Sequence, residues 1–141
     1  MNHLDVKCER KKDAQGDAYI DISFYIDGHA LLDMIQAFER PFAGDLAGSY
    51  QGNHPGYYTE DLLLGKESGY GDESDKTELL CCTCGCAGCW PLAARITVTG
   101  ESVMWDAFEQ PHRDWSYEGF GPFVFDLRQY RAAIALIQGV A

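Results

Sequence analysis

Residues 18–26 read Ala-Tyr-Ile-Asp-Ile-Ser-Phe-Tyr-Ile, and apolar residues recur at every second position. Successive side chains of a strand point to opposite faces, so this alternation predicts a strand that is buried on one face. The expected inward set is Ala18, Ile20, Ile22, Phe24 and Ile26. The expected outward set is Tyr19, Asp21, Ser23 and Tyr25. The stretch therefore predicts a sheet with one face on a core.

A second alternating segment precedes this strand. In residues 3–9, Leu4, Val6 and Cys8 share one face, and this Cys8 is expected to act as a small hydrophobic residue. The polar link 10–17 contains Gly16. The two segments predict a hairpin with a loose loop.

Two segments have helical spacing. The first covers about 29–40 and ends at Pro41, because proline breaks the helical hydrogen-bond pattern. The second follows Asp126, a good N-cap, with Gln129 placed to complete a capping box and Gly139 as a stop. Their apolar stripes are Leu31, Leu32, Ile35 and Phe38, and Leu127, Tyr130, Ile134 and Ile137.

Further strands are expected in the second half of the chain. Residues 77–82, 94–99 and 102–109 are the candidates, and the turn Gly100-Glu101 suits a type II′ hairpin. The region 41–76 is rich in glycine and has few periodic signals, so it is expected to be a long loop that is functional or mobile. Within it, Leu62 to Leu64 can pack as a short turn.

The order of these elements predicts an α+β fold. We expect an antiparallel sheet of about five strands, two helices packed on one face and a cysteine-rich loop. The chain of 141 residues is the length of one domain, so 1–141 is expected to be a single domain.

The net charge of −11 limits the class of partner. Nucleic acid is not expected, because its binding needs a basic surface. A basic protein partner fits the charge, and so does a role in solubility alone.

The sequence also indicates a compartment. No positively charged start followed by an apolar run marks a signal peptide, and no apolar stretch has the ~18 residues that span a membrane. We therefore expect a cytoplasmic protein, in which thiols are reduced and clustered cysteines serve as metal ligands or redox groups.

Five of the six cysteines lie in the segment 81–89, which reads Cys-Cys-Thr-Cys-Gly-Cys-Ala-Gly-Cys. Zinc takes four ligands in a tetrahedron, and Cys82 and Cys84 share one face of an extended segment. Cys89 can return to the same point after a turn of small residues. Cys81 points the other way and is expected to be a core residue or a spare.

The fourth ligand is open between Cys86 and His112. Four cysteines within eight residues are crowded around one ion, and His112 follows a strand that is expected to pair back across the cysteine hairpin. Buried thiols without a metal are an alternative interpretation. Thiolates suit several soft ions, so iron is an alternative to zinc.

Three motifs indicate a resemblance. The sequences CTCG (82–85), GCWPL (88–92) and FEQPHR with a following Trp115 and Tyr117 (108–117) resemble a group of small uncharacterised bacterial proteins. The resemblance implies a shared fold and a site built on Cys82, Cys84 and Cys89. It favours His112 over Cys86, and it implies no activity.

A polar and aromatic segment surrounds His112. Arg113, Trp115 and Tyr117 are residue types that anchor interfaces, so they predict a binding surface. In the alternative interpretation, Trp115, Tyr117, Phe120 and Phe123 cover the edge of the core. No catalytic motif is present.

The expected function is that of a binding module with a structural zinc, immunity-like toward a basic partner. The absence of catalytic motifs in the sequence favours this interpretation over an enzyme. A small metal-dependent enzyme, or a metal or redox sensor that uses the segment 81–89, is the alternative.

Overall fold

The computed structural model describes all residues except 13–14, 67–75, 83–90, 112–113 and 140–141. Its helices are α1 (Leu31–Ala43), α2 (Glu60–Leu63) and α3 (Leu127–Gln138), with 3-10 turns at Gly44–Leu46 and Pro55–Tyr57. Its strands are β1 (Leu4–Lys12), β2 (Ala18–Ile26), β3 (His29–Ala30), β4 (Tyr50–Gln51), β5 (Lys76–Cys82), β6 (Leu92–Thr99), β7 (Ser102–Glu109) and β8 (Phe123–Asp126).

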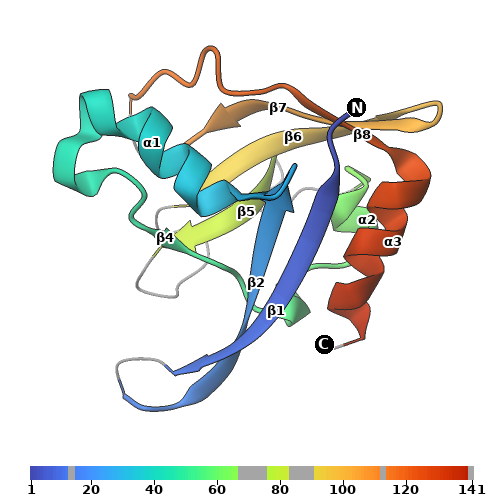
Figure 1. The fold of residues 1–141 in the computed structure, drawn as a ribbon, viewed down its shortest axis with the longest axis horizontal. Coiled ribbons are helices and arrows are strands. Elements are labelled where there is room, and N and C mark those ends of the chain that lie inside the picture. The colour runs from blue at the N-terminus through green and yellow to red at the C-terminus, as the bar shows by residue number, and fades with distance from the viewer. Residues whose placement is uncertain (13–14, 67–75, 83–90, 112–113, 140–141) are drawn as a thin grey trace.

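The strands form two antiparallel sheets, with the orders β1-β2-β3 and β4-β5-β6-β7-β8. The predicted α+β class, with an antiparallel sheet of about five strands, is confirmed. The predicted cysteine-rich loop lies outside the described residues. The β1–β2 hairpin crosses in front of the larger sheet, and its far end projects below the body of the molecule (Figure 1).

Two isolated bridges join the sheets at their edges. Asn2 pairs with Phe125 beside β1, and Ile22 of β2 pairs with Asn53 just after β4. The larger sheet therefore curls round and meets the hairpin on both sides. The closure leaves fewer open strand edges, which are otherwise sites of unwanted pairing.

One hydrophobic core fills the space between the two sheets. Phe24 of β2 meets Trp105 of β7 edge to face, with ring centroids 5.4 Å apart. The indole nitrogen of Trp105 donates to the hydroxyl of Tyr130 at 3.2 Å, and that hydroxyl donates to the carbonyl of Leu63 at 2.6 Å. The core therefore also ties α3 to β7 and α2.

Most predicted elements are present, with shifted ends. The strand predicted at 102–109 and the turn at Gly100–Glu101 are confirmed, and Leu62 to Leu64 are buried in and beside α2. The predicted end of the first helix at Pro41 is wrong, because α1 continues to Ala43. Phe42 in that last turn packs against aromatic rings beyond β7, and this contact holds the extra residues in the helix.

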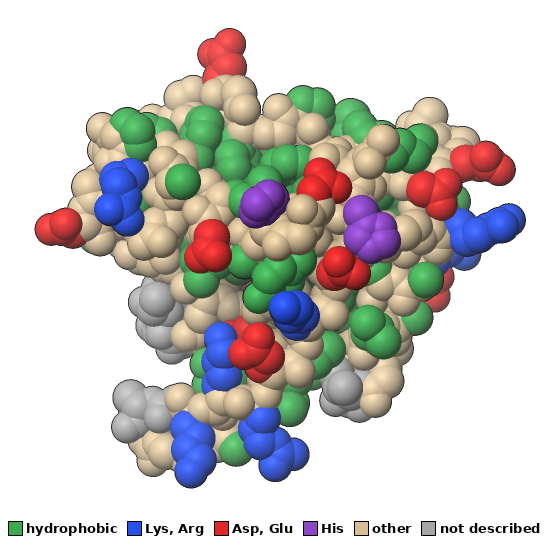
Figure 2. Space-filling model, viewed as in Figure 1, with side chains coloured by type: hydrophobic (Ala, Val, Ile, Leu, Met, Phe, Trp, Pro, Cys, Tyr) green, Lys and Arg blue, Asp and Glu red, His purple; other side chains and the backbone are tan. Residues whose placement is uncertain are grey.

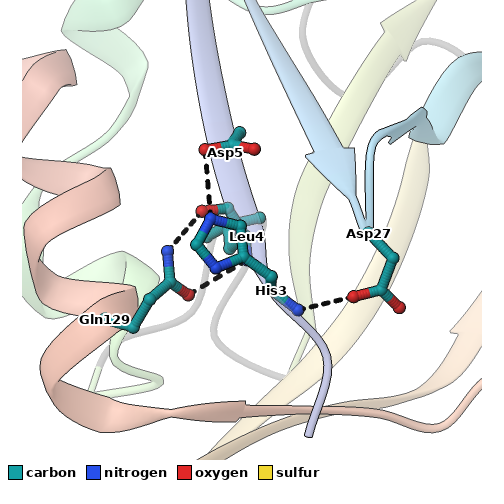
Figure 3. A network of polar contacts seen from close by, with 5 residues as sticks. All are labelled: His3, Leu4, Asp5, Asp27 and Gln129. Atoms are coloured by element: carbon teal, nitrogen blue, oxygen red, sulfur yellow. Dashed lines mark hydrogen bonds and ion pairs between the residues drawn. The ribbon is translucent and has the colours of Figure 1, made fainter.

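The predicted capping box at α3 is half formed. The Asp126 carboxylate accepts from the backbone N–H of Gln129 at 3.0 Å, as an N-cap does. The Gln129 side chain does not return to Asp126, however. Its Nε2 donates to the Leu4 carbonyl at 2.6 Å, and its Oε1 accepts from the Leu4 N–H at 3.0 Å (Figure 3). One side-chain amide thus pairs with β1 as a neighbouring strand would.

The same end of β1 is held from its other side. Asp27 Oδ1 accepts from the His3 N–H at 2.7 Å (Figure 3). The Asp27 N–H donates back to the His3 carbonyl at 2.9 Å. Asn2 pairs with Val124 through its own N–H and its side-chain oxygen. No helix among the described residues combines the length and the apolarity needed to cross a membrane.

We predict that Gln129→Ala lowers the free energy of unfolding by about 1–3 kcal/mol, because both polar groups of Leu4 lose their partner. Urea denaturation measures this change. Arg128→Ala, at an exposed neighbouring position of the same helix, serves as the control and is expected to stay within ~0.5 kcal/mol of the parent. Equal effects of the two substitutions would contradict the proposed role of the amide.

Candidate functional site

The described ends of three strands meet at one end of the larger sheet. Leu80 of β5 pairs with Leu92 of β6, and Ala93 of β6 pairs with Glu109 of β7. The last residues of β5 and β7 therefore flank the first residues of β6. Neighbouring strands lie ~4.8 Å apart, so the ends of β5 and β7 are separated by ~10 Å.

Most of the predicted metal ligands lie outside the described residues. These are Cys84, Cys89, His112 and the alternative ligand Cys86. Cys82 is the last residue of β5, and its backbone pairs with Tyr50 of β4. Within the described residues, no group of three or more His, Cys, Asp or Glu side chains is placed to hold a metal ion.

The two remaining cysteines lie where the sequence predicted them. Cys81 is buried, and its thiol donates toward the carbonyl of Gly52 at 3.5 Å. Cys8 is half-buried against the core, and burial raises the pKa of its thiol. Both act as small hydrophobic residues.

A buried carboxylate organises the segment that follows β7. Glu39 of α1 has no exposed surface. Its Oε2 accepts from the hydroxyls of Tyr50 and Tyr117 at 2.6 and 2.5 Å, and its Oε1 accepts from the N–H of Gly48 at 2.9 Å. An ionised carboxyl group can be buried only when donors replace its water, and here three do so.

The tyrosine hydroxyls remain donors in this cluster. Burial raises the pKa of Tyr50 far above its usual value near 10, and the hydrogen bond to Glu39 raises it further. Tyr50 belongs to β4 and Tyr117 to the segment between β7 and β8. The cluster therefore fixes this segment against α1 and β4.

The predicted binding-surface residues occupy different environments. Tyr117 is buried, and its ring stacks on Phe38 with centroids 5.9 Å apart. Trp115 is half-buried and lies 5.6 Å from the ring of Phe42, which is 43% exposed. Arg113 lies outside the described residues. Trp115 and Phe42 therefore form the exposed part of this aromatic cluster.

Asp21 lies on the outward face of β2 as the alternation predicted, but its burial there was not predicted. Asp21 is 1% exposed, because the segment after β4 lies over it. Its carboxylate accepts from Ser23 Oγ at 2.9 Å and from the Gly52 N–H at 3.1 Å. A side chain at position 52 would put a Cβ 2.2 Å from the Ile22 carbonyl, so the close approach requires glycine.

The sequence carries no signal for this contact. Asp21 and Gly52 are thirty-one positions apart, and each is common on exposed surfaces and in loops. Glu39 was missed for the same reason, because its burial depends on contacts with Gly48, Tyr50 and the distant Tyr117.

Comparisons with protein-family models, with curated proteins and with solved structures gave no match to this chain.

We predict that Glu39→Gln lowers the free energy of unfolding by about 2–4 kcal/mol, because it removes a charge and places an amide donor against existing donors. Tyr117→Phe removes one donor and is expected to cost about 1–2 kcal/mol. Chemical denaturation followed by tryptophan fluorescence measures both. Glu118→Gln changes the same charge at an exposed position and is the control. A Glu39→Gln effect no larger than that of the control would show that the cluster carries little stability.

Proposed function

We propose that the protein is a non-enzymatic binding module in which a structural zinc ion holds together the segments at one end of the larger sheet. The single observation that supports the zinc is the meeting of the ends of β5, β6 and β7. Cys84 and Cys89 follow β5 and His112 follows β7, so both segments begin at strands that flank β6.

The proposed ligands are Cys82, Cys84, Cys89 and His112. A separation of ~10 Å between the ends of β5 and β7 can be spanned by a few residues on each side, since an extended residue covers ~3.3 Å. Four protein ligands fill the coordination of zinc and leave no position for a substrate. A site of this type stabilises a loop and performs no chemistry.

The buried acids in the described part of the chain support binding over catalysis. Glu39 and Asp21 accept hydrogen bonds from donors of the fold itself. Carboxylates held in this way are engaged in maintaining structure. A general base needs an accessible lone pair within reach of a substrate proton.

The proposed partner is a basic protein. The charge of −11 favours it, because opposite charges steer association and fix orientation. The aromatic pair of exposed Phe42 and half-buried Trp115 supplies apolar contact area, and Asp114 next to Trp115 is exposed and acidic. Aromatic residues beside acids are a suitable surface for a basic, partly apolar segment.

We predict one zinc per chain in protein purified under reducing conditions without added metal. Elemental analysis is expected to show loss of the zinc in Cys84→Ser, Cys89→Ser and His112→Ala, because each removes a ligand. Cys86→Ser and Cys8→Ser are matched controls and are expected to retain it. Absence of metal from the parent protein would overturn the zinc site. Retention of zinc by His112→Ala would instead indicate three ligands and an open position, as in an enzyme.

We predict that the tagged protein, isolated at low salt from the cells that produce it, retains a basic protein that is released at high salt. Phe42→Ala is expected to weaken retention. Leu136→Ala is the matched control, because Leu136 is 56% exposed on α3 and lies outside the aromatic pair. Lack of any retained protein, or equal loss with both substitutions, would count against a partner bound at this surface.

A further inference from the structure

A pocket of about 240 Å³ opens on the outward face of β2. Alternate residues of β2 form its floor, the first turn of α1 forms one wall and β4 with Gly52 forms the other. Of its acidic lining residues, Asp21 is buried, whereas Glu9 and Asp33 are exposed. The described lining of the pocket does not include the aromatic pair Phe42 and Trp115, and it reaches the end of β5 at Leu80.

One cation of the chain already reaches this pocket. The ammonium group of Lys11 lies 3.6 Å from Asp21 Oδ1, beyond the ~3.2 Å limit of a good hydrogen bond. The Lys11 side chain is 44% exposed and comes from the projecting end of the β1–β2 hairpin. Figure 2 shows Lys and Arg side chains gathered on that end of the molecule. Lys11 therefore forms an ion pair with Asp21 from the pocket rim.

The charges of the pocket favour a further cation. Among its described lining residues are the three carboxylates of Glu9, Asp21 and Asp33 and one ammonium, that of Lys11, which leaves a net charge of −2. Tyr25 on the floor offers an aromatic ring, and the same ring already attracts the ammonium of Lys7 at 4.2 Å from its centroid. Acids and an aromatic ring together are the groups that recognise organic cations.

The size and the apolar part of the lining restrict the ligand further. A volume of 240 Å³ equals that of about eight water molecules at ~30 Å³ each, which is close to the seven heavy atoms of an arginine side chain. Leu32, which is half-buried, supplies apolar surface for an aliphatic stem. A bare metal ion would leave most of this space and the apolar walls unused.

We propose that this pocket binds an alkylguanidinium or alkylammonium group of about arginine size, with the cation at Asp33 and the aliphatic stem against Leu32. The group can belong to a free small molecule or to a side chain of a peptide. The proposal depends on neither the zinc ion nor the basic partner, because no residue of either site takes part.

The test uses N-acetyl-arginine amide as the probe, titrated into the full chain and followed by NMR chemical shifts or calorimetry. Binding with a Kd on the order of 1 mM is expected for a ligand of this size. N-acetyl-citrulline amide has nearly the same shape without the charge, and it is expected not to bind at the same concentrations. A short peptide that contains arginine and binds more tightly than the capped amino acid would identify a peptide as the source, and equal affinity would identify a small molecule.

Two pairs of variants assign the binding to the pocket. Asp33→Asn is expected to weaken binding of the probe at least about threefold. Asp5→Asn removes the same charge from β1 outside the pocket and is expected to leave the affinity for the probe unchanged. Lys11→Met is expected to increase the affinity for the probe about threefold, because it removes the competing cation. Lys12→Met is its control, since the neighbouring residue is exposed and does not line the pocket.

Three results would overturn the proposal. The first is absence of probe binding to both the parent protein and Lys11→Met. The second is equal binding of the arginine and citrulline probes. The third is an equal change of affinity in each variant and its control, which would indicate attraction by the overall charge and not by this pocket.

Discussion

The pairing of the Gln129 amide with the backbone of Leu4 is the contact on which the arrangement of the two sheets depends. β1 is the edge of its sheet, and on that side its N–H and C=O groups have no strand to pair with at Leu4. The amide offers one donor and one acceptor in the spacing that a neighbouring strand would provide. α3 is thereby fixed beside β1, and its buried face completes the core that both sheets share.

Buried carboxylates perform a comparable task on the opposite side of the hairpin. Glu39 gathers donors from β4, from the turn before it and from the segment after β7. Asp21 fixes the backbone at Gly52 over β2. Both acids lie where irregular segments cross regular elements. The N–H groups of these segments are not paired within a helix or a sheet, so side-chain acceptors bind them instead. Polar contacts of this kind position a segment more specifically than apolar packing does.

The sequence predicted the elements whose signals are local. Alternation identified β1, β2 and β7, and the helical spacing and the N-cap at Asp126 identified α3. Strands of two to four residues, such as β3, β4 and β8, were not predicted, because too few positions exist for a period to appear. Glu39 and Asp21 were missed because their burial results from contacts with distant segments. The proposed zinc ligands are the reverse case: their spacing is informative in the sequence, and most of them lie outside the described residues.

The bond between Leu4 and Gln129 joins residues that are 125 positions apart. A hairpin that closes early from local contacts must therefore wait for almost the whole chain before its outer edge is covered. Long-range closures of this kind slow folding, because a large loop has to be ordered before the contact forms. During synthesis, the β1–β2 hairpin leaves the ribosome before α3, so the edge of β1 lacks this partner until α3 has been made. The amide that finishes the fold is thus also what ends the period in which the nascent protein is vulnerable to aggregation.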